Sequence, residues 1–163
     1  MRQSGLKLNI GCGDYAYPEL VNCDIAYGKG VNVVCDALSL PFKDDSVEEV
    51  YMIHVIEHFR LFDARKVLKE AARVLKKGGL LIVEFPDIEK AIKLYNEDGN
   101  LGSLLKALYG TQHKDYELHQ HYFGWFTDLM MKELSDAGLR IHHTGKGSAH
   151  KKPERDTRVQ AIK

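Results

Sequence analysis

The stretch LKLNIGCGDYAYPELVNCD, residues 6–24, decides the fold of this chain. An apolar run, Leu6–Ile10, leads into a turn with two glycines, Gly11 and Gly13, and a second apolar run ends on Asp24. Glycine has no Cβ and tolerates positive φ, so such a turn lets the backbone approach a ligand closely. An acid at the end of the next strand can accept hydrogen bonds from both hydroxyls of a ribose. We interpret the stretch as a pocket for an adenosine-bearing cofactor; the alternative is a tight turn followed by an unrelated surface acid.

The composition argues for one globular domain without a nucleic-acid or membrane partner. The chain has 163 residues, with 23 Lys plus Arg and 23 Asp plus Glu, so its formal net charge is zero. Nucleic-acid-binding proteins typically carry a basic excess or stripe, and the one basic cluster, residues 146–155, has the Gly, Ser and Pro of a loop. No apolar run approaches the length of a membrane span, and the N-terminus lacks the apolar core of a signal peptide. We expect a cytoplasmic protein.

Three cysteines, Cys12, Cys23 and Cys35, are too few and too evenly spaced for a disulfide framework. Each lies near the carboxyl end of a predicted strand. Three thiols there could hold a metal, but zinc ligands usually come in close pairs. We expect small buried residues where the strands meet the loops.

Strand and helix patterns alternate along the whole chain. Seven runs have strand length: Leu6–Ile10, Leu20–Asp24, Val31–Cys35, Val47–Ile53, Leu80–Phe85, Leu139–His143 and Thr157–Lys163. Apolar residues at helical spacing predict a helix capped by Asp63 and stopped by Gly78 and Gly79, with others after Asp87, around Leu101–Leu108 and from Thr127. A polar loop joins the last two strands, as in an antiparallel hairpin. The pattern predicts a single α/β doubly wound domain over residues 1–163.

Four segments in order make the chain similar to the class I S-adenosylmethionine-dependent methyltransferases, of the small type 11-like kind. They are LNIGCG (8–13), CDALSLPFKDDSVEEVYMIHVIEHF (35–59), EAARVLKKGGLLIVEFPD (70–87) and WFTDLMMKELSDAGLRI (125–141). The resemblance implies a Rossmann-like, seven-stranded, mostly parallel sheet with an antiparallel last strand. It also implies an enzyme that transfers a methyl group from S-adenosyl-L-methionine, leaving S-adenosyl-L-homocysteine, with the cofactor across the carboxyl ends of the first strands.

The resemblance also assigns roles to single residues. The loop would pass under the methionine part of the cofactor, Asp24 would hold the ribose hydroxyls, and Asp36 would accept from the adenine amino group. The full expected cofactor set is Asn9, Gly11, Cys12, Gly13, Asp24, Ile25, Asp36, Ala37, Leu38 and His54. In this set Ile25 packs on the adenine, the Ala37 amide meets a ring nitrogen, and His54 lines the sulfonium side. A plain turn-forming role for Asp36 is the alternative.

Two features depart from the family pattern. The third glycine of the first loop is absent, and only 11 residues separate Gly13 from Asp24, where the related dinucleotide fingerprint has about 20. Residues 15–18 must therefore form a loop or a single turn. The chain also begins almost at its first strand, without the helices that often cover the cofactor. We expect a more open pocket and weaker cofactor binding, which keeps a non-catalytic cofactor-binding or scaffold protein open as an alternative.

The sequence His54-Val55-Ile56-Glu57-His58 matches the H-x-x-E-H pattern of inverted zinc proteases. It follows a strand, however, whereas that metal site needs a helix. Some methyltransferases bind a divalent ion through a Glu-His pair here with an acid three residues before the Glu, a position that His54 occupies. His119 and His121 could complete a site. We expect no metal, with Glu57 and His58 orienting the loop through hydrogen bonds.

The aromatic, histidine-rich segment Tyr109–Trp125 lies where this family places substrate-binding elements, within an expected insertion at about residues 96–125. The expected substrate contacts are Tyr109, His119 and Trp125, and the expected general bases are His58 and His121. A plain surface loop is the alternative. We expect direct displacement of the methyl group by an O, N or C nucleophile of a small-molecule acceptor, since zero net charge disfavours nucleic acid. The oligomeric state is open.

Two further classes remain. An NAD-linked oxidoreductase would use the same opening, because Gly11-x-Gly13-x-x-Ala16 satisfies a loose dinucleotide fingerprint. The short spacing to Asp24 counts against it. A metal-dependent hydrolase would require stoichiometric zinc.

Overall fold

The structure is a computed structural model that describes residues 5–112, 119–149 and 153–163. Its elements, in chain order, are β1 (Lys7–Ile10), β2 (Val21–Asp24), β3 (Val33–Val34), β4 (Val47–Ile53), the 3-10 turn η1 (Ile56–His58), α1 (Leu61–Val74), β5 (Leu75–Pro86), α2 (Ile88–Asp98), α3 (Leu101–Tyr109), α4 (Thr127–Asp136), β6 (Arg140–Lys146), the 3-10 turn η3 (Pro153–Arg155) and β7 (Asp156–Ile162).

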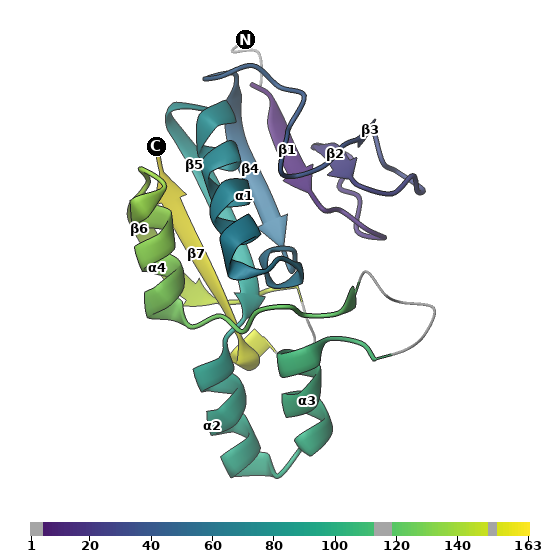
Figure 1. Cartoon of the computed structure of the whole chain (residues 1–163), viewed down its shortest axis with the longest axis vertical. Coiled ribbons are helices and arrows are strands. Elements are labelled where there is room, and N and C mark those ends of the chain that lie inside the picture. Colours follow the sequence, from purple (N-terminus) through teal and green to yellow (C-terminus); the bar gives the residue numbers. More distant parts are fainter. Residues whose placement is uncertain (1–4, 113–118, 150–152) are drawn as a thin grey trace.

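The strands form one seven-stranded sheet in the order β3-β2-β1-β4-β5-β7-β6 (Figure 1). The strands from β3 to β5 pair in parallel, and β7 runs antiparallel to both β5 and β6. The predicted single α/β domain with a mostly parallel sheet and an antiparallel last strand is confirmed. Parallel pairing puts the carboxyl ends of β1, β2 and β4 at one edge of the sheet, where the sequence places its candidate site.

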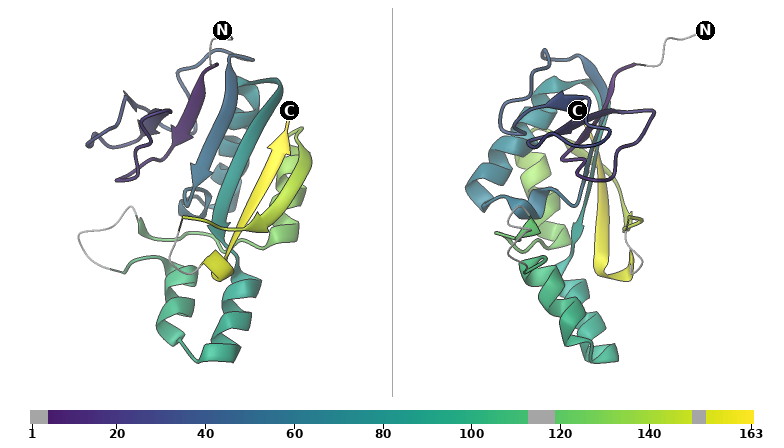
Figure 2. Two further views of the ribbon diagram at one scale, coloured as in Figure 1. Left: turned by 180° about the vertical axis from the view of Figure 1, so that it is seen from behind. Right: turned by 90° about the vertical axis from the view of Figure 1, so that its right-hand side faces the viewer.

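The two faces of the sheet differ in what covers them. Helices α1 and α4 pack on one face, as the side view in Figure 2 shows. That face carries the core side chains of the strands, all at most 3% exposed: Leu8, Ile10, Val50, Met52, Leu81, Val83, Phe85, Val159 and Ala161. On the other face polar pairs form instead, such as Lys7 with Glu49 at 2.7 Å and Tyr51 with Glu49 at 2.6 Å. Among the described residues, α1 and α4 therefore cover one face of the sheet, and polar pairs lie on the other.

The end of α1 also differs from the prediction. Gly78 and Gly79 were expected to stop the helix, yet α1 ends at Val74 and β5 begins at Leu75. The Nζ of Lys163 donates to the carbonyls of Arg73 and Leu75, at 3.2 and 2.8 Å. A cation at a helix C-terminus is favourable because it offsets the unpaired carbonyls there. The two glycines lie inside β5, where Gly78 has a φ of 79°.

The start of α1 differs as well, because Arg60 and not Asp63 is its N-cap. Asp63 lies in the first turn, where a carboxylate favours the helix dipole. The caps of α2 and α3 are side-chain caps: Asp87 accepts from the amides of Glu89 and Lys90, as predicted, and Asn100 accepts from Ser103.

A cluster of asparagines holds the short connection between β1 and β2. The side chain of Asn22 donates to the carbonyls of Tyr17 and Leu20, while its Oδ1 accepts from Asn9 and from the Tyr17 amide. Buried side-chain amides here replace the backbone bonds of a helix, so the residues from Gly11 to Leu20 stay in place as a loop. The predicted loop in place of a helix is confirmed.

Helices α2 and α3 form a hairpin beyond the carboxyl edge of the parallel strands (Figure 1). Asp87, at the start of α2, connects the hairpin to the sheet, because its carboxylate also accepts from the hydroxyls of Thr127 and Thr157.

In the described parts of the chain, no helix has both the length and the apolar character needed to cross a membrane.

Candidate active site at the carboxyl edge of the sheet

The turn after β1 has the conformation that the two glycines predict. Gly11 and Gly13 have φ values of 65° and 48°, in the left-handed region that favours glycine. A Cβ on Gly11 would lie 2.7 Å from Cγ2 of Val55, so a side chain there would collide. A Cβ on Gly13 would meet nothing within 4 Å, and Gly13 is exposed. The turn therefore packs against the protein at Gly11 and presents open backbone at Gly13.

Asp24, at the end of β2, closes this turn. Its Oδ2 accepts from the Gly13 amide at 2.8 Å, and its Oδ1 accepts from the Ala26 amide at 3.0 Å. A carboxylate has about four lone-pair sites, so Asp24 retains acceptor capacity for a ligand after both bonds. Its side chain is half-buried and the following Ile25 is 57% exposed.

Asp36 lies in the next loop along the same edge. The amide of Cys35 donates to the carbonyl of Asp24 at 2.8 Å, which joins the two loops directly. The Oδ1 of Asp36 accepts from the Leu38 amide at 2.9 Å, and the side chain is exposed. This Asx-type turn is the structural role considered for Asp36, and it leaves Oδ2 at the surface. The structure thus brings together Gly13, Asp24 and Asp36, as predicted.

Two members of the expected cofactor set are buried. Asn9 is 2% exposed, and its amide nitrogen donates to the Tyr15 carbonyl and to Asn22, so it supports the loop from below. Cys12 is 3% exposed, and its amide donates to the Cys23 carbonyl. All three cysteines are free thiols, and burial raises the pKa of Cys23 to about 12. Their predicted packing role is confirmed for the buried Cys12 and Cys23, and Cys35 is half-buried.

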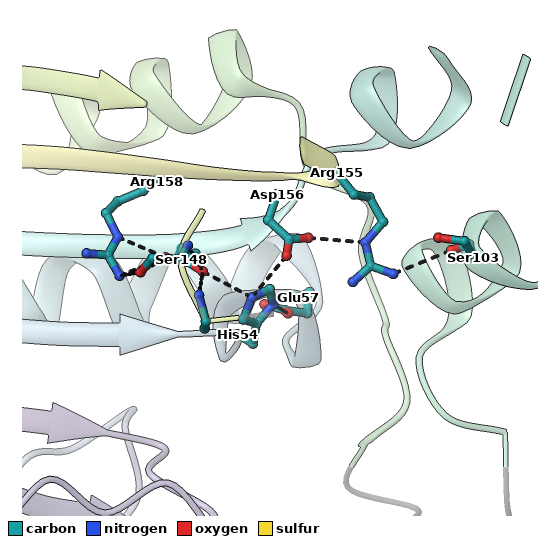
Figure 3. Close-up of polar contacts among 9 residues, drawn as sticks. His54, Glu57, Ser103, Ser148, Arg155, Asp156 and Arg158 are labelled. Carbon is teal, nitrogen blue, oxygen red and sulfur yellow. Dashed lines mark hydrogen bonds and ion pairs between the residues drawn. The ribbon is translucent and has the colours of Figure 1, made fainter. Parts of the chain in front are cut away.

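His54 lies in a buried network of charges, not in an open cofactor pocket (Figure 3). Its Nδ1 lies 3.1 Å from Oε1 of Glu57, and its Nε2 lies 3.5 Å from Glu84 and 3.6 Å from Asp156. Arg158 pairs with Glu84 at 2.8 Å on the far side. The network joins the ends of β4, β5 and β7.

The carboxylates set the charge of His54. Burial alone would lower its pKa, but Glu57, Glu84 and Asp156 outweigh that effect and raise the pKa to about 9. The ring is therefore an imidazolium at neutral pH. A cation would repel a positively charged sulfonium, so the charge of His54 disagrees with its expected place beside the methyl donor.

Sequence reasoning missed the partners of His54. Glu84 stands within the apolar run Leu80–Phe85, and an acid at a core position of a central strand is the signal that could have revealed a buried pair. Burial would raise its pKa, but His54, the amides of Ala149 and Ser148, and Arg158 lower it to about 2.

A second polar cluster lies beside η1. The rings of His58 and His121 are 5.1 Å apart between centroids, and those of His58 and His119 are 6.4 Å apart. The carbonyl of Glu57 accepts from the amides of Tyr122 and Phe123, at 2.9 and 3.3 Å. These backbone bonds hold the segment before α4 against η1, so the two histidines expected to act as bases do lie together.

The expected substrate contacts separate into exposed and buried residues. Tyr109 is 54% exposed, and His119 is exposed. Trp125, in contrast, is fully buried and packs edge-on against Phe85 and Phe123. The expectation of a substrate contact at Trp125 is wrong, because its ring belongs to the core below α4. Residues 113–118, in the middle of the expected insertion, lie outside the described residues.

The exposed edge fits the adenosine part of the family's cofactor. Gly13 leaves open space in front of the turn, Asp24 keeps lone pairs for two hydroxyls, and Asp36 keeps an oxygen for an amino group. A flat, mostly apolar base needs only a few such polar groups for its orientation.

Comparisons with known proteins identify similar domains and folds. A family model described as a methyltransferase domain matches residues 14–83. A probable tRNA methyltransferase 9B from Mus musculus is 36% identical over 97 residues, which cover 50% of this chain and 22% of that protein. The matched regions amount to only 21–27% of the lengths of the first curated relatives.

Solved methyltransferases share the fold over nearly the whole chain. A methyltransferase from Thermotoga maritima, described as a possible histamine N-methyltransferase, has a TM-score of 0.66 at 24% identity, covering 98% of this chain and 83% of that one. A Burkholderia thailandensis 1,6-didemethyltoxoflavin-N1-methyltransferase with bound S-adenosylhomocysteine has a TM-score of 0.66 at 10% identity, covering 98% and 71%. Residues 14–83 thus match a methyltransferase domain, and the described chain shares the fold of solved S-adenosylmethionine-dependent methyltransferases.

Proposed function

We propose that this chain is a methyltransferase that binds S-adenosyl-L-methionine at the carboxyl edge of β1, β2 and β3 and methylates an O, N or C nucleophile. The observation that carries the proposal is the pair of contacts at Asp24, whose carboxylate closes the Gly13 turn while it retains acceptor sites at the surface. Asp36 extends the same edge by one loop. The family match over residues 14–83 supports the proposal, since it includes Asp24 and Asp36.

The chemistry that the cofactor supplies when bound is an activated methyl group on a sulfonium. The contribution of the protein is mainly binding and orientation, because well-aligned reactants can gain about 7–11 kcal/mol from positioning. Asp24 and Asp36 would fix the adenosine, and the open backbone at Gly13 would allow close approach. If the acceptor carries a proton, His121 or His58 is the group placed to take it, provided that its Nε2 is not bound to a metal ion. Burial lowers the pKa of His121 below its usual value, which keeps its ring neutral.

For the acceptor, we propose a small molecule. Its support is the zero net charge, which offers no excess of cations for a phosphate backbone. A tRNA acceptor is the second candidate, favoured by the name of the Mus musculus relative. One measurement distinguishes the two candidate acceptors. Transfer of a radiolabelled methyl group is tested separately with total tRNA and with a small-molecule extract.

The first test is calorimetric titration of S-adenosylhomocysteine into the purified chain and into Asp24→Ala. We expect binding that the substitution weakens about tenfold or more. Asp14→Ala is the matched control, since Asp14 is an exposed acid of the same loop, and it should bind like the unchanged chain. Absence of binding at millimolar ligand would reject the cofactor site.

A non-catalytic cofactor-binding protein is the remaining alternative. It would bind S-adenosylhomocysteine in the calorimeter yet transfer no label to either acceptor pool. Tight NADH binding without S-adenosylhomocysteine binding would instead revive the oxidoreductase interpretation.

A further inference from the structure

Glu57, His58 and His121 converge on one point beside η1. Each offers one donor atom, and the three atoms lie within 4.8 Å of one another. Glu57 and His58 come from η1, whereas His121 comes from the segment before α4, 63 residues further along the chain. Ligands from two segments that the backbone holds together can form a site with fixed geometry.

Both histidines are oriented by backbone carbonyls. The Nδ1 of His58 lies 2.9 Å from the carbonyl oxygen of Gln120, and the Nδ1 of His121 lies 2.8 Å from that of Ala107. A carbonyl only accepts hydrogen bonds, so each Nδ1 carries the proton and each neutral ring keeps its lone pair on Nε2. Histidines that bind metals are usually held in this way, with the second ring nitrogen donating to a carbonyl or carboxylate.

Glu57 supplies the second, independent observation. Its side chain is 2% exposed, and its Oε1 is engaged by His54. Its Oε2 is buried and has no hydrogen-bond partner among the described residues. A buried carboxylate oxygen without a partner is costly, and a bound cation would remove that cost.

The surrounding backbone makes the site rigid. The amides of Tyr122 and Phe123 donate to the Glu57 carbonyl, and the amide of His121 donates to the Tyr109 carbonyl at 3.2 Å. Gly110 permits this approach, because a Cβ there would lie 2.0 Å from the carbonyl oxygen of His119 and 2.8 Å from the ring of His121.

We propose that Glu57, His58 and His121 bind one divalent transition-metal ion, with zinc-like preference. Two imidazoles and one carboxylate suit Zn²⁺, Fe²⁺, Co²⁺ or Ni²⁺, whereas Mg²⁺ and Ca²⁺ take mainly oxygen ligands. Three protein ligands leave at least one coordination position open, as in catalytic metal sites. The sequence favoured a loop-orienting role for Glu57 and His58, because the acid of the related pattern is replaced by His54. In the structure His54 contacts Glu57 but is not one of the three proposed ligands, and His121 provides the third ligand.

The test is metal binding by the tag-free chain after removal of metals with a chelator. Co²⁺ is titrated while its visible absorption is followed, and Zn²⁺ is then added in competition. We expect one Co²⁺ per chain, with a spectrum that Zn²⁺ displaces. His58→Ala and Glu57→Gln should each weaken binding about tenfold or more. Glu57→Gln keeps an oxygen for His54, so it tests the ligand charge with little change in shape.

The matched control is His143→Ala, because His143 is an exposed histidine on β6. It should leave Co²⁺ binding unchanged. Circular dichroism of each variant confirms that it is folded, and His121→Ala serves as a third ligand variant. Lack of a Co²⁺ spectrum in the unchanged chain, or equal affinity in the folded ligand variants, would overturn the proposal. The readout needs neither cofactor nor acceptor, so its failure leaves the proposed methyltransferase function untouched.

Discussion

Nδ1 of His54 lies 3.1 Å from Oε1 of Glu57, although the backbone of His54 has a φ of 56°. A left-handed conformation costs a residue other than glycine about 1 kcal/mol or more. The contact with Glu57, together with those to Glu84 and Asp156, therefore holds His54 in a strained turn at the end of β4.

We expect the stability of the chain to fall as pH rises from about 6.5 to about 9. The pKa of His54 is raised to about 9, so its stabilising charge is fully present below 6.5 and is lost as the folded state deprotonates. The free energy of unfolding in urea, measured across this range, checks the prediction. In His54→Gln this alkaline slope should be smaller, while His143→Gln, at an exposed site, should keep it.

At acid pH the stability of the chain depends on Glu84, and here it falls as the pH falls. Its pKa is lowered from 4.5 to about 2, so its contribution is complete above pH 4.5 and disappears as pH falls to 2. The shift corresponds to about 3 kcal/mol of stability. Glu84→Gln should reduce the dependence on pH in this range, and Glu19→Gln, an exposed acid, should not. An unchanged acid slope in Glu84→Gln would contradict the prediction.

The charge network also shows where sequence reasoning ends. The presence of seven strands, the Asp87 cap and the final hairpin follow from local patterns, and all three could be predicted. The strand bounds were less certain, because β5 spans Leu75–Pro86 and β3 only Val33–Val34. The pairing of His54 with Asp156 joins residues about a hundred positions apart, and only strand register brings them together. The early end of α1 has the same origin, because Lys163 reaches its last carbonyls from the other end of the chain.

The expected cofactor residues could be predicted from the sequence better than the expected substrate contacts and bases. Gly13 and Asp24 follow their strands closely, so their spacing placed them at one edge, and the resemblance to the methyltransferases added Asp36. Trp125 was misplaced because an aromatic residue in a polar segment can equally fill the core, and the packing against Phe85 decides between the two. The orientation of His58 and His121 depends on the carbonyls of Gln120 and Ala107, which no sequence pattern encodes.

The two glycines of the first turn should differ in their response to alanine. Gly11→Ala combines a φ of 65° with a contact of 2.7 Å to Val55, whereas Gly13→Ala has open space and only its φ of 48°. We expect Gly13→Ala to cost about 1 kcal/mol of stability and Gly11→Ala to cost clearly more. Urea unfolding of both variants gives the comparison, and equal losses would contradict it. If the cofactor approaches the turn as proposed, Gly13→Ala should also weaken S-adenosylhomocysteine binding.

Asn22 should be one of the most sensitive polar residues of the fold. Its side chain is 3% exposed and connects Asn9, Tyr17, Leu20 and Asn32. Truncation in Asn22→Ala leaves several buried polar groups without their partner, at a cost of about 3 kcal/mol. Asn32→Ala, at an exposed partner, should cost less. The midpoints of urea unfolding give the order, and hydrogen exchange at residues 15–20 should report local loosening in Asn22→Ala.

Gly110 should affect the position of His121 relative to His58, although Gly110 is not one of the proposed ligands. In Gly110→Ala the new Cβ would lie 2.0 Å from the His119 carbonyl oxygen, so the backbone at residues 119–121 must move. His121 then shifts relative to His58, because its amide is bonded to the Tyr109 carbonyl next to the substitution. We expect the variant to fold, since the displaced segment lies at the edge of the domain, but to lose at least tenfold in Co²⁺ affinity. Gly102→Ala, in the first turn of α3, is the matched control, because its Cβ would meet only the side chain of Asn100 at 3.6 Å. Equal Co²⁺ affinity in the two alanine variants would show that the close approach at Gly110 does not position His121.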